Sequence, residues 1–327
     1  TWAFIRRSDF TDTLALAERL MTHKHDLMHK AVGWMLREVG KRDRDTLTDF
    51  LERYATQLPR TALRYAIEHY PEDRRQYFLK MDEQLKAKLK EWAGIYNVRS
   101  FIPDDPVQFP HRFTEKRDIE ISAFITSWIS YGRRKLILRK ADWLHSRMGG
   151  SPYEWVLSGR YWELVSDVPA GKRDTFYRFY THSDLCALCD RLKEIYQRYD
   201  SLEDALAASS YPNPVFKLQD LFSGINGIPV MGGTSACKRL AMFLRWMVRT
   251  DGIVDFGIWQ TVFHPRQLII PLDTHVHQIS LELGLTQQRT ATLKTALEIT
   301  EALSHIFPDD PCLGDFALFG YDINKGK

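Results

Sequence analysis

Residues 224–285 read GINGIPVMGGTSACKRLAMFLRWMVRTDGIVDFGIWQTVFHPRQLIIPLDTHVHQISLELGL, and this stretch decides the fold of the chain. It begins with a glycine-rich turn and continues into a helix-forming run with Lys238 near its start. An apolar segment then ends at Pro271, and Asp273 opens a second amphipathic run. A lysine and an aspartate that each stand at the beginning of a helix would make a pair of nucleophile and carboxylate.

Hydrophobic periodicity predicts the two helices. Apolar residues recur at three- and four-residue steps in both runs, as Ala236, Leu240, Phe243, Leu244 and Met247, and as Leu272, Val276, Ile279 and Leu283. We therefore expect each helix to be buried on one side only. Lys238 lies about 200° around its helix from Leu240, so its side chain should point away from the apolar stripe. Asp273 falls at an N-cap position, where the positive end of the helix dipole favours a charged carboxylate.

Less specific interpretations stay open for this pair. A lysine on the polar face of an amphipathic helix is most often only solvated, and an aspartate before a helix is most often only its cap. The glycines of the turn have a functional interpretation as well, because they can bring backbone N–H groups close to a phosphate. These glycines are Gly224, Gly227, Gly232 and Gly233.

The order of these features resembles that of the helix-hairpin-helix DNA glycosylase superfamily. The resemblance rests on the glycine hairpin, on Lys238 after it, and on the string PLDTHV that contains Asp273. The hairpin departs from the pattern Leu-Pro-Gly-Val-Gly, and Asp273 follows Lys238 by 35 positions, a longer interval than in the endonuclease III branch. The longer interval resembles the archaeal 8-oxoguanine glycosylase branch, and residues 81–327 also resemble an uncharacterised bacterial family with the same signature.

The resemblance implies catalytic roles for Lys238 and Asp273. In the superfamily the lysine attacks the sugar of a nucleotide whose base has left the stack, and the aspartate assists. The chemistry suits both side chains, because a carboxylate stabilises the oxocarbenium-like sugar that forms when a glycosidic bond breaks. The lysine must be neutral when it attacks, and the neighbouring cation of Arg239 would favour that form. We expect Arg239, Gly232 and Gly233 to be among the DNA-binding residues.

Length and composition indicate a folded protein with two domains or one large one. The chain has 327 residues, of which 44% are hydrophobic and 13% aromatic. No stretch approaches the roughly eighteen apolar residues of a membrane span. The chain begins at Thr1 with neither methionine nor signal peptide, which suggests a trimmed or fragmentary start. Four cysteines without a disulfide pattern fit a reducing cytosol, so we expect a cytoplasmic, nucleoid-associated monomer that needs no cofactor.

Residues 1–80 are predicted to be helical throughout, and short paired helices of this kind suggest HEAT-like repeats. Helical periodicity marks the segments 14–21, 25–40, 45–59 and 60–71. The strings HKAVGWMLRE at 29–38 and PRTALRYAI at 59–67 resemble the end of the AlkD-type DNA alkylation repair family. That resemblance implies a DNA contact for Trp34, with a core position as the alternative. The family's earlier helices, which carry its catalytic acid, have no counterpart here, so we do not expect this segment to excise alkylated bases by itself.

Residues 81–327 are predicted to form the glycosylase-like domain. A charged helix over 72–92 leads into it, and the proline-rich segment 97–113 is predicted to be loop. The net charge of +3 belongs entirely to residues 1–80, so a nucleic-acid surface in the second domain must be a local patch. The best candidate is YGRRKLILRKADWLHSR at 131–147, with six basic side chains and one acidic side chain.

The start of this patch follows a helix, DIEISAFITSWIS, that has the composition of a buried element. In the glycosylase superfamily the corresponding turn carries a residue that fills the gap left by the flipped base. The resemblance therefore makes Tyr131, Gly132 and Arg133 candidates for that wedge. Arg134 and Lys135 would then bind phosphates. The alternative is a solvated, basic start of a helix.

Near the C-terminus, one more amphipathic helix precedes the string GDFALFGYD at 314–322. In the archaeal branch an acid on a late helix contacts the oxidised purine. The resemblance thus implies that role for Asp315, with Phe316 or Phe319 stacking on the base. A helix cap is the alternative for Asp315.

No metal site is expected. His25 and His29 share one helix face, as the zinc ligands of some proteases do, but no third ligand accompanies them. A metal-dependent hydrolase that uses His275 and His277 would need both on a strand, whereas the helical period continues through them.

These patterns predict an all-α protein, with HEAT-like repeats at residues 1–80 and a helix-hairpin-helix glycosylase-like domain at 81–327. We expect a DNA N-glycosylase that removes a damaged base, such as an oxidised purine, from double-stranded DNA and has Lys238-dependent AP lyase activity. A non-catalytic DNA- or RNA-binding protein with the same fold is the main alternative. The metal-dependent hydrolase is the weaker one.

Overall fold

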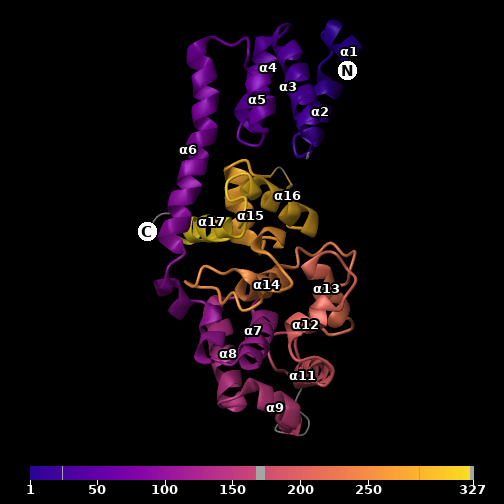
Figure 1. The fold of residues 1–327 in the computed structure, drawn as a ribbon, viewed down its shortest axis with the longest axis vertical. Coiled ribbons are helices and arrows are strands. Elements are labelled where there is room, and N and C mark those ends of the chain that lie inside the picture. Colours follow the sequence, from indigo (N-terminus) through magenta and orange to yellow (C-terminus); the bar gives the residue numbers. More distant parts are fainter. Residues whose placement is uncertain (24, 167–173, 287, 325–327) are drawn as a thin grey trace.

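The computed structural model describes residues 1–23, 25–166, 174–286 and 288–324. In these residues the chain is all-helical, without a β-strand (Figure 1). An isolated antiparallel bridge joins Tyr177 to Tyr180. The prediction of an all-α fold is therefore confirmed. None of the described helices is long and apolar enough to cross a membrane.

The N-terminal helices pack together at the top of Figure 1. They are α1 (Trp2–Arg6), α2 (Thr11–Leu20), α3 (Asp26–Gly40), α4 (Arg44–Tyr54) and α5 (Arg60–Ala66). Each of the four predicted helical segments overlaps one of α2 to α5. Their apolar faces share a core that includes Leu36, Leu51 and Leu63. Gly33 lets α3 approach α5 closely, because a Cβ at that position would collide with the backbone of Ala62.

Helix α6 (Glu72–Tyr96) runs along one side of the molecule and connects the N-terminal helices to the rest of the chain (Figure 1). Its first half contributes Phe78 to the N-terminal core. Its second half contributes Leu89 and Ala93 to a second, larger core. The boundary expected after residue 80 therefore falls inside a continuous helix that serves both cores.

The second region consists of short helices around this larger core. In chain order they are η1 (Arg99–Asp104), η2 (Pro106–Gln108), η3 (Pro110–Arg112), α7 (Lys116–Ile129), α8 (Arg134–Met148), α9 (Pro152–Ser158), η4 (Arg160–Trp162), α10 (Glu163–Ser166), α11 (His182–Tyr196), α12 (Leu202–Ala207), α13 (Pro214–Leu221), α14 (Lys238–Val248), η5 (Pro265–Gln267), α15 (Thr274–Glu282), α16 (Leu293–Ser304) and α17 (Leu313–Asn324). The segment 97–113, expected to be loop, instead forms η1 to η3, since proline favours the first turn of η2 and η3.

Helix α7 organises the second core and is buried from residue 118 to residue 129. The Glu120 carboxylate accepts hydrogen bonds from the Tyr196 hydroxyl at 2.7 Å and the Leu202 N–H at 3.0 Å. It also accepts the indole N–H of Trp259 at 2.6 Å. Burial raises the pKa of Glu120. Three separate segments are thereby attached to one point of α7.

Helix α14 passes through the second core, and every residue from 240 to 248 is buried. The expectation that this helix is buried on one side only is therefore wrong. Its polar side is enclosed because its charges are paired there. Arg245 binds Asp255 and Asp315, and Arg249 binds Asp255 and two further aspartates. These ion pairs fix α14, and with it the position of its first residue.

Candidate active site

Lys238 is the first residue of α14 and stands where the loop from α13 enters the helix. The preceding residue, Cys237, has a left-handed backbone conformation with φ of 54°. Its N–H donates to the Ser235 hydroxyl at 3.1 Å. The Lys238 side chain remains 36% exposed, although the body of the helix is buried. The amine is thus accessible to a reactant while the backbone that carries it is held in place.

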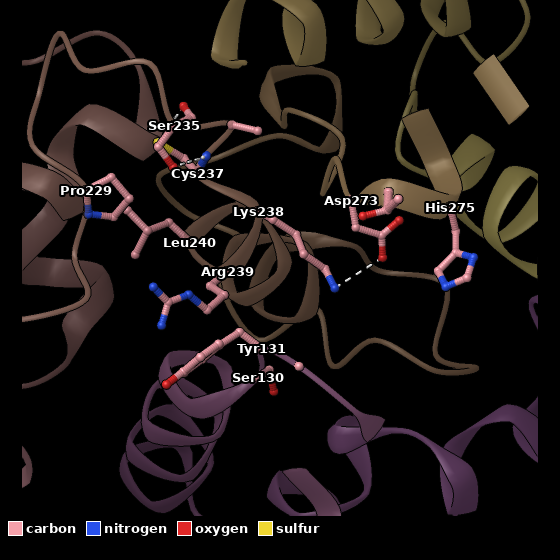
Figure 2. Close-up of a pocket in the computed structure, with 13 residues that line it drawn as sticks. Ser130, Tyr131, Pro229, Ser235, Cys237, Lys238, Arg239, Leu240, Asp273 and His275 are labelled. Carbon is pink, nitrogen blue, oxygen red and sulfur yellow. Dashed lines mark hydrogen bonds and ion pairs between the residues drawn. The ribbon is translucent and has the colours of Figure 1, made fainter. Parts of the chain in front are cut away.

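Asp273 is the N-cap of α15 and faces Lys238 (Figure 2). One carboxylate oxygen accepts the N–H of Val276 at 2.9 Å, and the other lies 3.2 Å from the Lys238 amine. The Asp273 side chain is only 16% exposed. The cap bond therefore orients the carboxylate toward the amine. In contrast to α14, helix α15 is buried on one side only, through Val276, Ile279 and Ser280.

The pair lies in the wall of an open cavity of about 430 Å³. The wall is formed by residues 130–132 after α7, by Pro229, and by residues 235–240 and 273–275. The N-terminal ends of α14 and α15 both meet the cavity there (Figure 2). Because a helix N-terminus carries a partial positive charge, the two ends add to the cationic character of the wall.

His275, on the first turn of α15, lines the same cavity. Its Nδ1 lies 2.7 Å from a carboxylate oxygen of Asp322 in α17, and its side chain is 53% exposed. A carboxylate beside Nδ1 places the imidazole proton on that nitrogen. Nε2 is then the ring nitrogen that can accept a proton.

Arg239 also lines the cavity, but its guanidinium is directed into the protein. It donates to the carbonyl groups of Trp128 and Gly227, the latter at 2.6 Å, and to the hydroxyl of Tyr180. These contacts tie the start of α14 to the end of α7 and to the α13–α14 loop. The structure thus gives Arg239 a bracing role in place of the expected contact with DNA.

The segment expected to form the DNA wedge adjoins the cavity. Tyr131 and Gly132 are part of its wall, and Gly132 has a φ of 93°. Arg133 and Lys135 are exposed, and Arg134 is half-buried. The basic start of α8 therefore lies beside the cavity, and its binding to DNA stays a prediction.

Two of the three C-terminal residues expected to contact the base, Asp315 and Phe316, are enclosed in the core. Asp315 is 5% exposed and paired with Arg245, and burial raises its pKa to about 6. Phe316 is 1% exposed and packs 4.4 Å from the Arg245 guanidinium. The roles predicted for Asp315 and Phe316 are therefore wrong, because both side chains belong to the core around α14. Phe319 is half-buried with its ring edge-on to His275 at 5.9 Å, outside the cavity wall.

The remaining predicted site residues lie on exposed surfaces. Gly232 and Gly233 are in the exposed part of the α13–α14 loop and are not part of the cavity wall. Trp34 is on α3, where 39% of it is exposed and its ring centre lies 5.4 Å from that of Trp2. Trp34 is thus a surface aromatic of the N-terminal helices and not a core residue. Whether these residues contact DNA stays a prediction.

Within the described part of the chain, no three histidine, cysteine, aspartate or glutamate side chains gather where they could hold a metal ion. His277 lies 2.7 Å from the carbonyl of Gln288, and His29 is bonded to the carbonyl of His23. The segment with His275 and His277 is helical, as its period predicted. The metal-hydrolase alternative therefore has no ligand set among the residues described.

Two parts of this site gave no signal in the sequence. Asp322 reaches His275 from the far end of the chain. The turn at Tyr177–Tyr180 places the guanidinium of Arg178 5.1 Å from the ring centre of Tyr131. Neither contact is encoded by spacing or periodicity, because each joins residues that only the packing of distant helices brings together.

Fold and site define an all-helical protein in which a lysine and an aspartate meet at the starts of two helices beside an open cavity. The chain belongs to the family described as protein of unknown function (DUF2400), whose model matches residues 105–324 and so includes the whole cavity wall. Residues 1–70 match the model of the family described as DNA alkylation repair enzyme. No curated protein and no solved structure matches the chain.

Proposed function

We propose that this protein is a DNA repair enzyme, a DNA N-glycosylase with AP lyase activity that depends on Lys238. The observation that carries the proposal is the Lys238 amine 3.2 Å from the Asp273 carboxylate in the wall of an open cavity. The match of residues 1–70 to a DNA alkylation repair enzyme model supports a DNA substrate. The resemblance of the hairpin, Lys238 and PLDTHV motifs to helix-hairpin-helix glycosylases supports the reaction.

The first step requires a nucleotide that has left the duplex stack, since neither side chain reaches C1′ inside an intact duplex. The neutral amine of Lys238 forms a bond to C1′ while the N-glycosidic bond breaks. The base departs with the electron pair of that bond and takes up a proton. Asp273 stabilises the positive charge that develops on the sugar. Its hydrogen bond from Val276 holds the carboxylate in the required orientation.

The second step is strand cleavage. The sugar ring opens to a Schiff base between Lys238 and C1′, which acidifies the protons on C2′. A base removes one of these protons, a double bond forms between C2′ and C3′, and the C3′–O bond breaks. We assign the proton transfer to His275, because this residue lines the cavity and Asp322 at Nδ1 leaves Nε2 as the accepting nitrogen. Water then hydrolyses the Schiff base and releases the lysine.

Binding of the double-stranded substrate is assigned to the basic start of α8. Arg133 and Lys135 are exposed beside the cavity and would bind the backbone phosphates that flank the damaged nucleotide. The N-terminal helices, which we treat as a unit of HEAT-like repeats up to residue 80, would contact the duplex through Trp34. The damaged base is proposed to be an oxidised purine, and the protein is proposed to act as a monomer.

Borohydride trapping tests this function. The protein is incubated with a duplex that contains an abasic site or one of a panel of damaged bases, and borohydride reduces any Schiff base to a stable adduct. Wild-type protein should form the adduct, Lys238→Gln should not, and Lys88→Gln, which removes an exposed lysine of α6, should match the wild type. Binding to DNA without any adduct would support the non-catalytic alternative and overturn the enzyme proposal.

A further inference from the structure

The turn between Tyr177 and Tyr180 carries an exposed aromatic ring close to the cavity. Tyr177 donates its N–H to the Tyr180 carbonyl at 3.1 Å, and Tyr180 donates its N–H to the Tyr177 carbonyl at 2.9 Å. Arg178 and Phe179 form the tip of the turn. Phe179 is 63% exposed, which makes it the most exposed aromatic side chain of the described residues.

The base of this turn is anchored. Tyr180 is fully buried, with its ring stacked on that of Trp128 at a centroid distance of 4.0 Å and its hydroxyl bonded to Arg239. Tyr177 donates its hydroxyl to the carbonyl of Tyr131 at 2.9 Å. The tip therefore projects from a rigid base, and that base is tied through Arg239 to the start of α14.

The backbone at the tip adopts an unfavourable conformation. Arg178 has a φ of 57°, in the left-handed region that residues with a side chain rarely occupy. Its guanidinium packs beside Gly132, where a Cβ would collide with it. The ring of Phe179 then lies 4.7 Å from that of Tyr131, which is part of the cavity wall. Strain of this kind persists only when the surroundings impose it, and it concentrates at functional positions.

We infer that Phe179 inserts into the base stack of the duplex beside the extruded nucleotide. The inference rests on the proposed function, since it assumes a duplex substrate. An apolar side chain between base steps unstacks them, and stacking on its ring replaces the lost contact. Tyr131, at the expected wedge position, is half-buried, and its hydroxyl lies 3.4 Å from the Tyr177 carbonyl. Its ring is therefore fixed and packs against the ring of Phe179.

A fluorescent base in the duplex tests the insertion of Phe179 without requiring any cleavage reaction. The duplex contains a tetrahydrofuran analogue of an abasic site, which cannot be cleaved, opposite 2-aminopurine, whose fluorescence rises when it leaves the stack. Wild-type protein should raise the fluorescence, Phe179→Ala should leave it near that of free duplex, and Phe179→Tyr should restore the rise. Phe4→Ala, which removes a ring that is 45% exposed on α1, should behave as the wild type. Because Phe179 is exposed, Phe179→Ala should unfold at the wild-type temperature.

Borohydride trapping supplies the second measurement. Phe179→Ala should trap a duplex lesion about tenfold more slowly, because it lacks one aromatic stacking contact. It should trap a single-stranded abasic oligonucleotide at the wild-type rate, since no stack has to be opened there.

Equal reporter fluorescence for wild type and Phe179→Ala would overturn the inference and leave the proposed function standing. If Phe179→Ala abolished the fluorescence response but wild-type protein formed no adduct, the insertion of Phe179 would be supported and the proposed AP lyase activity would be overturned. No response and no adduct from wild-type protein would overturn both.

Discussion

Asp273 has two roles that different substitutions separate. As N-cap of α15 it accepts the Val276 N–H, and as an anion it faces the Lys238 amine. Asparagine caps a helix about as well as aspartate but carries no charge. The ion pair between Asp273 and Lys238 contributes little stability of its own, because the Lys238 side chain is partly exposed and water screens its charge. The cap and the charge can therefore be measured independently.

Asp273→Asn should keep the melting temperature of the wild type and lower the rate of borohydride trapping by on the order of a hundredfold, the usual effect of losing one electrostatic contact to a transition state. Asp273→Ala should lose the same activity and, in addition, about 1 kcal/mol of stability with the cap. Trapping rates and urea unfolding of the two variants provide the measurement. If Asp273→Asn formed the adduct at the wild-type rate, the Asp273 carboxylate would have no role in the mechanism.

At the scale of elements, two of the glycines in the α13–α14 loop share a backbone conformation but have different surroundings. Gly224 has a φ of 84° and Gly227 a φ of 86°. A Cβ on Gly224 would meet open space, whereas a Cβ on Gly227 would overlap the ring and hydroxyl of Tyr180. Since Arg239 is bonded to both Tyr180 and the Gly227 carbonyl, the position of this loop is coupled to the start of α14.

Gly224→Ala should cost roughly 1–2 kcal/mol of unfolding free energy, the penalty of a left-handed backbone for a residue with a Cβ. Gly227→Ala should cost roughly a further 1–3 kcal/mol, because Tyr180 must move in a packed core. Urea unfolding compares the two. Gly227→Ala should also slow trapping while Gly224→Ala does not. Equal losses of stability would mean that the contact with Tyr180 is unimportant.

For the molecule as a whole, the stability of the second core depends on a neutral histidine. His145 of α8 is 4% exposed, and its two ring nitrogens lie 2.7 Å from the Ser122 hydroxyl and 2.7 Å from the Ala141 carbonyl. Burial lowers the pKa of His145 to about 4, from an ordinary value of 6.5. Above pH 6.5 the neutral ring is favoured in both the folded and the unfolded chain. Between pH 6.5 and 4 only the unfolded chain takes up the proton, so the folded state loses stability.

The unfolding free energy should therefore fall as the pH is lowered from 6.5 to 4, by up to roughly 3 kcal/mol from this group alone. His145→Gln cannot titrate and should show a shallower pH dependence, even if its stability at pH 7 is lower. His69→Gln, at an exposed histidine, should keep the wild-type slope. Urea unfolding at several pH values measures these slopes. Parallel curves for wild type and His145→Gln would show that this ring is not the acid-sensitive group.

The sequence by itself indicated many of the helices and placed Lys238 and Asp273 at two of their starts. Helical periodicity and capping depend on residues within about four positions of one another, so they can be recognised without a fold. The all-α class followed from such local patterns, and so did the helical state of the segment with His275. The motif around the pair also indicated the chemistry proposed for it.

Only the tertiary structure decided which side chains meet. It enclosed α14 on all sides, and the ion pair with Arg245 removed Asp315 from any surface that a base could reach. It turned Arg239 inward, brought Asp322 to His275, and left the ring of Phe179 exposed beside the cavity. The physical reason is that burial and ion pairing depend on the packing of segments far apart in the chain, and no local pattern encodes that packing.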